Sequence, residues 1–486
     1  MKNRSPDITP ERDRSLSYWV ALACIGGIPV GIGLVASPRL LMTALGLCCM
    51  LVLIIPLFRR QTIDVFEPPV LLGLPVFIGV VLRTAVILWS ENPELEAYHL
   101  LGEPPAILLP ALVIILVGLV ALVLGYLFPI KVQLKSLPFV SRDVWRANRL
   151  TILGIIVLIL AGAAAVDYAR RISFWSSLSG GIFSKRFVEL QDARWKYATL
   201  GYHKWLTDLS SLLFLFMVAW FAERKESLLS VRGVILIGSL VIPVFCGVML
   251  SSRSTMLYPI VLGTLAWHLL RRRIPLRSAV VLLLTGAVLW AGLGVWRAAS
   301  QGKSIQWDFT GRHSLGGALS WNRNWMGVAK TAHIVKQIPD NIPYEFGRTF
   351  ALPVVAPIPR NLWRGKPIVR VGKIIGPLIY GFQGRRTGVP PGMLGEYYWN
   401  FGLPGVITGM FLMGVVLRFL YTNLGPGAAP NKSAIVLYIL LVVPLALRFP
   451  GTDFTGLVAL VGKYAVPAII FLLLCARESE KEDEKA

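Results

Sequence analysis

Charged residues are scarce in this chain. Asp, Glu, Lys and Arg make up 15% of its 486 residues, whereas 55% are hydrophobic. A soluble globular protein of ordinary composition carries about 25% charged residues. The shortage therefore argues against a water-soluble domain and indicates that much of the chain lies in a bilayer.

Cysteine and histidine are also few, with five of each. The cysteines lie in apolar runs without paired or metal-ligand spacing, which argues against a disulfide framework or a zinc site. The sequence has no Walker-type phosphate loop, no H-E-x-x-H, no G-x-S-x-G and no C-x-x-C. Paired metal-binding carboxylates are missing from the predicted outer loops. We therefore expect neither a metal nor a cofactor.

What the chain does have is a series of long apolar runs. Runs of about 17 to 25 residues are long enough to cross a bilayer core of about 30 Å. We place about twelve spans, near residues 18–36, 40–58, 69–89, 106–127, 150–168, 206–222, 233–251, 254–270, 277–297, 396–420, 433–448 and 455–476. Backbone polar groups must be satisfied inside lipid, so these spans are helices. The predicted fold class is all-α, a polytopic transmembrane helical bundle.

The short loops set the predicted orientation, because Lys and Arg resist translocation. Arg59-Arg60, residues 131–149 and Arg271-Arg272-Arg273 fall on one side, which we assign to the cytoplasm together with both termini. The loop 91–103, which has no Lys or Arg, falls on the other side. The predicted location is the inner (plasma) membrane of a bacterium.

Two outer connections are too long to be turns, near residues 169–205 and 298–395. We divide the chain into residues 1–297, with nine spans and the first of these periplasmic loops, residues 298–395, a large periplasmic loop expected to fold, and residues 396–486, with three spans and a cytoplasmic tail. The formal net charge of +23 suits nucleic acid, anionic lipid or a phosphorylated substrate. Because many of the cations lie outside beside the membrane, we expect no nucleic-acid partner.

Basic residues at the predicted outer edge are the first candidates for chemistry. Arg253 lies in a very short turn between two spans, where a guanidinium is costly without an anionic partner. Arg360, Arg364 and Lys366 lie within seven residues between prolines, and their charges match a diphosphate. Alternatively, Arg253 extends to lipid headgroups and the basic loop rests on anionic lipid.

Two further arginines, Arg186 in the shorter outer loop and Arg385 before the tenth span, join this candidate diphosphate-binding set. His313 is a candidate proton acceptor because histidine titrates near neutral pH, although a lone histidine is more often structural.

The start of the tenth span holds a second group of candidates. Glu396 and Asn400 are four residues apart and share a helix face. Glu396 could accept a proton from a sugar hydroxyl while Tyr397 and Tyr398 stack against the sugar ring and Asn400 binds it. Alternatively, the aromatic residues form an interfacial belt, which we favour for Trp399, and Glu396 pairs with a nearby arginine.

These segments resemble the O-antigen polymerase, or oligosaccharide repeat-unit polymerase, family. The resemblance is carried by the Ser-Ser-Arg-Ser turn at 251–254, by Ile358-Pro359-Arg360 with Lys366-Pro367, and by the segment 395–405. The span count and the large outer loop agree with the family over nearly the whole chain. The resemblance implies a fold like that of GT-C-type glycosyltransferases.

The resemblance also implies a reaction. An inverting, metal-independent glycosyltransferase would move a growing glycan from undecaprenyl diphosphate to the non-reducing sugar of a new lipid-linked repeat unit, at the periplasmic face. Arg253, Arg360, Arg364 and Lys366 would hold the diphosphate, and Glu396 would be the base or the group that positions the acceptor. The implied partners are undecaprenyl-diphosphate-linked oligosaccharide, membrane lipid, a chain-length regulator and a flippase.

Three alternatives remain open at this point. An O-antigen ligase would resemble this chain closely and differ in its acceptor. A flippase for the same lipid would have charged or broken helices near mid-membrane and symmetry between its halves; only Asp208 and Asp453, near span ends, suit it. A non-catalytic scaffold gives no reason for clustered outer arginines.

Overall fold

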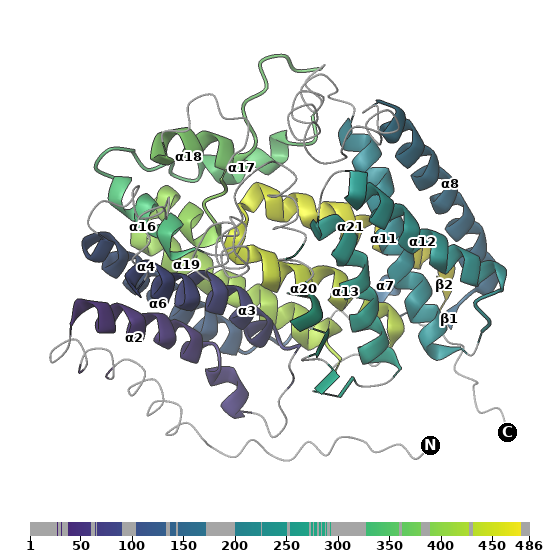
Figure 1. The fold of residues 1–486 in the computed structure, drawn as a ribbon, viewed down its shortest axis with the longest axis horizontal. Helices are drawn as coiled ribbons and strands as arrows, with labels where there is room; N and C mark the ends of the chain where they lie inside the picture. Colours follow the sequence, from purple (N-terminus) through teal and green to yellow (C-terminus); the bar gives the residue numbers. More distant parts are fainter. Residues whose placement is uncertain are drawn as a thin grey trace.

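The structure is a computed structural model, and it describes residues 27, 31, 37–59, 64, 66–89, 104–132, 137–141, 144–171, 200–224, 226–249, 253–271, 274–275, 277–278, 281–282, 284–286, 288, 292, 327–358, 362–380, 389–426 and 431–477. The helices, contacts and distances of the structure are those of these residues. Their fold is a bundle of helices with one very small sheet (Figure 1).

Long apolar helices account for most of the described chain. Nine segments are long and apolar enough to span a membrane. They are built from α2 (Pro38–Val52) with η1 (Ile55–Arg59), α3 (Pro68–Val76) with η2 (Phe77–Leu82) and α4 (Arg83–Trp89), α6 (Pro104–Leu127), α8 (Ala147–Arg171), α11 (Leu200–Glu223), α12 (Val231–Met249), α19 (Met393–Leu424), α20 (Lys432–Arg448) with η4 (Phe449–Gly451), and α21 (Phe454–Cys475). A shorter apolar helix, α13 (Arg253–Leu270), follows α12. The protein is therefore a polytopic helical membrane protein.

Ten of the predicted spans coincide with these ten segments. The predicted spans at 18–36 and 277–297 lie outside the residues that can be described continuously. This agreement is expected. In a helix of about 20 apolar residues the backbone polar groups bond one another, and the side chains present an apolar surface to lipid or protein.

Helix α20 forms the centre of the bundle. Of its most apolar stretch, 83% is buried in protein, whereas for α8 the fraction is 28%. Helix α20 contacts α3, α13, α19 and α21, while α8 packs mainly on α11, α12 and α21 among the described elements. The exposed face of α8 is rich in Ile and Leu, as expected of a helix at the lipid boundary.

Close packing joins α6 to α19, and glycine makes it possible. A Cβ added at Gly125 would lie 2.0 Å from the carbonyl oxygen of Phe411, and one at Gly414 would lie 2.0 Å from that of Leu122. Small residues allow helix backbones to approach in this way within membranes. The contact holds the middle of α19, at Phe411 and Gly414, against α6.

The tenth predicted span, expected as one continuous helix, is broken near its start. Within α19, Phe401 and Gly402 have non-helical backbone angles, and Gly402 has a φ of 61°. A Cβ at Gly402 would also meet the hydroxyl of Tyr344 at 3.0 Å. With Pro404 two residues further on, the segment Met393–Asn400 forms a short helix distinct from the rest of α19.

The connection between the ninth and tenth predicted spans is folded where it is described, as the sequence predicts. It contains α16 (Val328–Gln337), α17 (Arg348–Val355) and α18 (Val371–Tyr380), which Figure 1 shows together at one side of the molecule. They share a small apolar core with Trp399, formed by Ile334, Ile338, Ile342, Leu352, Val371, Ile375 and Ile379. We call this end of the bundle the loop end.

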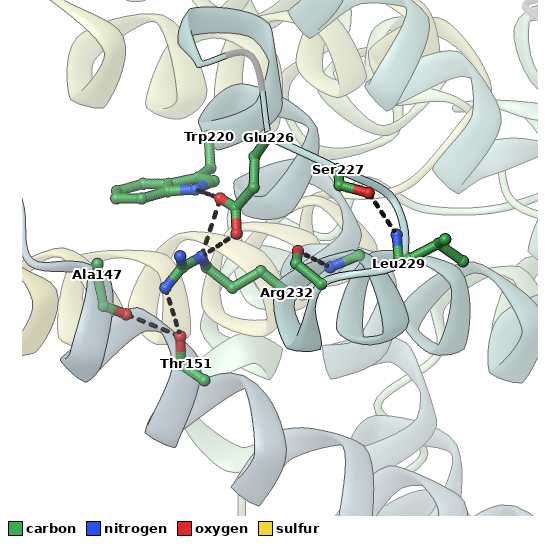
Figure 2. Close-up of polar contacts among 9 residues, drawn as sticks. Ala147, Thr151, Trp220, Glu226, Ser227, Leu229 and Arg232 are labelled. Carbon is green, nitrogen blue, oxygen red and sulfur yellow. Dashed lines mark hydrogen bonds and ion pairs between the residues drawn. The ribbon is translucent and has the colours of Figure 1, made fainter.

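The opposite end is fastened by polar contacts. Trp220, Arg232 and Thr151 belong to α11, α12 and α8, and Glu226 lies in the connection between α11 and α12 (Figure 2). The Glu226 carboxylate accepts hydrogen bonds from Trp220 Nε1 at 2.8 Å and from Arg232 Nε at 2.7 Å, and Arg232 Nη1 reaches Thr151 Oγ1 at 3.4 Å. Burial acts to raise the pKa of Glu226, but the hydrogen bonds from Trp220, Ser230 and Arg232 outweigh it and lower the pKa.

The same end carries the only departure from an all-α fold among the described residues. Strands β1 (Val144–Trp145) and β2 (Ala476–Arg477) pair antiparallel, each next to the end of a long helix. Nearby, Lys432 Nζ lies 2.5 Å from Glu223 Oε2. The contacts join several helix ends at this end of the bundle, and the side of the membrane that it faces stays a prediction.

Candidate functional site

Buried polar side chains collect at the loop end. We call this group the polar layer and define it as Arg83, Lys330, His333, Thr349, Lys366, Glu396, Asn400 and Asp453, each of which is at most 9% exposed. Burying such groups is costly unless other polar groups or opposite charges surround them. A layer of this kind under a cap of short helices is the best candidate site in the described chain.

Glu396 is fully buried and lies beside Asn400, Thr349 and Asp453. Its Oε2 accepts a hydrogen bond from the backbone N–H of Phe454, the first residue of α21, at 2.6 Å. Its Oε1 is also buried, and no described residue forms a hydrogen bond of ordinary geometry with it. The Thr349 side chain lies beside the carboxyl group. In this structure the carboxyl group is closed to solvent and holds the start of α21 against α19.

Asp453 supplies a second buried carboxyl group next to Glu396. It is the N-cap of α21, and its Oδ1 accepts from Gly456 N at 2.6 Å. Burial is the main cause that raises the pKa of Asp453, while hydrogen bonds from the backbone of Gly456 and Gly372 and the charge of Arg370 oppose the rise. The two carboxyl groups thus join α18, α19 and α21. An Asp directly before an apolar run is a recognisable N-cap signal.

The side-chain amide of Asn400 links α19 to the start of α17 through both its oxygen and its nitrogen. Its Oδ1 accepts from Gly347 N at 2.8 Å, and its Nδ2 donates to Thr349 Oγ1 at 2.7 Å and to Glu396 O at 2.8 Å. Glu396 and Asn400 therefore share a helix turn, as their spacing predicts. In this state, however, the Asn400 amide contacts protein on every described side.

The aromatic residues beside Glu396 lie in different surroundings. The Tyr397 ring packs 5.8 Å from the ring of Phe350, and Tyr398 packs on the small apolar core of the loop helices. Both are partly buried. Trp399 is fully buried in that core, so the prediction of an interfacial belt position for Trp399 was wrong. The error arises because the start of α19 is covered by loop helices instead of lipid.

Of the predicted diphosphate-binding cations, the side chains of Lys366 and Arg364 are described. Lys366 Nζ donates to the carbonyl oxygens of Ala356 at 2.7 Å and Ile358 at 2.6 Å, just beyond the end of α17. Arg364 is exposed to solvent. Arg253 is the first residue of α13, but its side chain lies outside the described part. Arg186, His313, Arg360 and Arg385 also lie outside it.

Sequence reasoning missed a group of buried basic residues. Arg83 interrupts an apolar run, and a Cβ at Gly327 would lie 3.0 Å from its Nη1 and 3.8 Å from Lys330 Cγ. His333 follows one turn after Lys330 on α16. Burial lowers the pKa of His333 to about 4, with the charges of Lys336 and Arg83 acting in the same direction, so its imidazole is neutral at pH 7. An arginine within an apolar run was the signal available in the sequence.

Within the described residues, no group of three or more His, Cys, Asp or Glu side chains is arranged to hold a metal ion. Cys48, Cys49, Cys246 and Cys475 are buried, and none of them forms a disulfide bond within the described residues. The chemistry that the polar layer offers is therefore that of carboxyl groups, cationic side chains and a neutral imidazole.

Comparison of this chain with protein families, with curated proteins and with solved structures finds no match. The fold and the site define a polytopic helical membrane protein with a buried polar layer beneath three short helices at one end of its bundle.

Proposed function

We propose that this protein polymerises undecaprenyl-diphosphate-linked oligosaccharide repeat units into a surface polysaccharide, such as O-antigen, capsule or exopolysaccharide. The reaction is an inverting, metal-independent glycosyl transfer at the loop end, which faces the periplasm of a bacterial inner membrane. The glycan leaves its lipid diphosphate and joins the terminal sugar of the next lipid-linked unit.

The observation that carries this proposal is the polar layer itself. The buried carboxyl groups of Glu396 and Asp453 lie next to each other, and the buried basic residues Arg83 and Lys330 lie at the same end of the bundle. Transfer from a diphosphate needs both kinds of group, since cations stabilise the leaving diphosphate and a carboxylate can take the proton of the attacking hydroxyl. A substrate anchored in the bilayer reaches such a layer from the membrane side.

The predicted roles carry over as proposals. Arg253, Arg360 and Arg364 hold the diphosphate, with Arg186 and Arg385 as further contacts. Lys366 is better suited to shaping the loop than to direct binding, because its ammonium already donates to two carbonyl groups. Tyr397 and Tyr398 offer rings to the sugar, and His313 is the second candidate for the proton acceptor.

Glu396 has two possible roles, and they make different demands on the structure. To act as a base, its carboxyl group must become accessible, which requires the α17 segment to move away from Asn400. To position the acceptor site, it needs only to keep α21 docked through Phe454. Replacing the carboxyl group with an amide separates the two roles, because an amide oxygen can still accept from Phe454 but cannot act as a base.

The proposal is tested with purified protein in vesicles that contain a lipid-linked repeat unit. Elongation of the glycan, seen as a ladder of lipid-linked products in mass spectra, supports the polymerase. A ligase would instead extend no chain until its separate acceptor, lipid A core, is added.

A second candidate function is a flippase for the same lipid, because two observations favour it. Asp208 of α11 and Lys463 of α21 form an ion pair within the spanning helices, and α19 is broken at Phe401 and Gly402. Charged and broken helices are typical of transporters. The vesicle assay separates the two, since movement of the lipid-linked sugar across the bilayer without elongation supports the flippase.

A further inference from the structure

A second polar cluster lies inside the bundle, between α11, α13, α20 and α21. The ion pair of Asp208 and Lys463 joins α11 to α21. The rings of Tyr258, on α13, and Tyr464 lie 5.3 Å apart, and Lys463 Nζ lies 4.9 Å from the centre of the Tyr464 ring. Ionisable side chains in spanning segments are rare and mark functional sites unless a structural role explains them.

Arg448 completes this cluster from the end of α20. Its guanidinium carbon lies 5.0 Å above the Tyr258 ring, and the side chain is exposed. Asp208 and Arg448 both lie close enough to act electrostatically on the hydroxyl groups of Tyr258 and Tyr464. We call these five residues, Asp208, Tyr258, Arg448, Lys463 and Tyr464, the intramembrane cluster.

The Tyr258 hydroxyl gives the cluster its most specific feature. Its oxygen is buried and has no hydrogen-bond partner among the residues that the structure describes. A buried hydroxyl without a partner costs free energy, and native proteins usually satisfy such groups. A donor on a ring that the Arg448 guanidinium overlies is arranged for an acceptor oxygen that comes from outside the chain.

The charges of the cluster select the ligand. Lys463 and Arg448 carry two positive charges against the single carboxylate of Asp208, so the cluster favours an anion. Its depth favours an anion attached to a lipid, because a water-soluble ion would have to leave water to reach it. Tyr258 follows Arg253 by five residues on α13, about 7.5 Å along the helix axis. The predicted diphosphate-binding turn and the cluster therefore lie along one helix.

We propose that the intramembrane cluster binds the diphosphate of the polyprenyl lipid, with Arg448 and the Tyr258 hydroxyl donating to its phosphate oxygens and Asp208 holding Lys463 in place beside them. This inference rests on the proposed function and assigns to its lipid substrate residues that the sequence did not indicate. Arginine and hydroxyl donors match phosphate oxygens well in a medium of low polarity. A purely structural reading, in which the ion pair only joins α11 to α21, gives no role to the Tyr258 hydroxyl.

The test compares binding of undecaprenyl diphosphate, which carries no sugar, to the purified full-length protein and two variants, Tyr258→Phe and Arg448→Gln. Native mass spectrometry measures the bound fraction. We expect each variant to bind about tenfold more weakly or worse, as for loss of a hydrogen bond to a charged group. The matched control is Arg418→Gln, because Arg418 lies 5.5 Å over the ring of Tyr126 and both residues belong to the opposite end.

The Tyr258→Phe variant separates a loss of lipid binding from a loss of folding. Since the Tyr258 hydroxyl has no described partner, Tyr258→Phe should leave the melting temperature unchanged or raise it. Undiminished binding of undecaprenyl diphosphate by both variants would overturn the inference. So would weakened binding of phosphatidylglycerol with no change for undecaprenyl diphosphate, because the cluster would then serve bulk lipid.

The two proposals can fail separately. If the wild-type protein elongates glycans while both variants bind undecaprenyl diphosphate normally, the intramembrane cluster is structural and the proposed function stands. If the variants lose the lipid but the wild-type protein elongates nothing, the binding site stands and the proposed function is wrong.

Discussion

Glu396 and Phe454 are joined by a hydrogen bond of 2.6 Å from the Phe454 backbone N–H to the Glu396 carboxylate. The bond connects the beginnings of α19 and α21, and its two residues are 58 positions apart in the sequence. Because Asp453 caps the same helix, two buried carboxyl groups stabilise the start of α21. The position of the candidate site thus depends on residues that also hold the bundle together.

Two substitutions of Glu396 can separate its structural role from a role in the reaction. Glu396→Gln keeps an oxygen that can accept from Phe454, so we expect it to fold and to stop chain growth if the carboxylate is the base. Glu396→Ala removes the acceptor and should cost about 1–3 kcal/mol of stability. Thermal unfolding and the glycan ladder are measured for both. Normal elongation by the Gln variant would rule out Glu396 as the base and leave it only the positioning role.

Asn400 is expected to control the attachment of the loop helices. Asn400→Ala removes three hydrogen bonds and leaves the Gly347 N–H without its acceptor, which should destabilise the segment 345–349 by about 1–3 kcal/mol. Hydrogen exchange of that segment measures the effect. The control is Asn341→Ala, since exposed Asn341 bonds only its neighbour Gln337. Equal exchange in both variants would show that Asn400 does not hold the loop.

His333 predicts a pH dependence of stability. Its pKa is about 4 in the folded protein, against an ordinary value of 6.5. Between these values the unfolded chain binds a proton that the folded chain does not, so stability falls as pH is lowered from 6.5 to 4. The full effect is at most about 3 kcal/mol.

We expect His333→Gln to reduce this loss of stability on acidification, as measured by thermal unfolding at pH 7, 6 and 5. If the wild-type protein and the variant lose stability in parallel, the imidazole is not held neutral.

Substitution of Glu226 should lower stability without affecting glycan elongation. Glu226→Gln weakens the contacts to Arg232 and Trp220 at the end opposite the polar layer (Figure 2) and should cost about 1 kcal/mol. Because the pKa of Glu226 is lowered on folding, its contribution is present above its unfolded pKa and is lost as pH falls through the folded value. The glycan ladder should stay as in the wild-type protein. Shortened glycans at full protein level would mean that this end also takes part.

The sequence predicts the architecture well because lipid imposes simple rules. A long apolar run has one stable form in a bilayer, and ten described segments follow it. The break at Phe401 and Gly402 was harder to predict, since Gly and Pro are common in membrane helices and the sequence does not show that Tyr344 packs against Gly402.

The site was predictable only in part, for a related reason. Glu396 and Asn400 were identified because they are polar residues at a span boundary, and the structure brings both into the polar layer. Lys463, Tyr258 and Arg83 gave weaker signals, because a single polar residue in an apolar run does not reveal its partners. Those partners lie on helices far away in the sequence, and only packing shows which side chains meet.

The central claim, that cations at the loop end hold a lipid diphosphate while its glycan is transferred, is tested most directly by glycan length in cells. Surface polysaccharide is analysed by gel and mass spectrometry in cells whose only copy carries Arg253→Ala or Arg360→Ala. With wild-type protein level in the membrane, the account predicts single lipid-linked repeats in both variants. Full-length polysaccharide from both variants would contradict it.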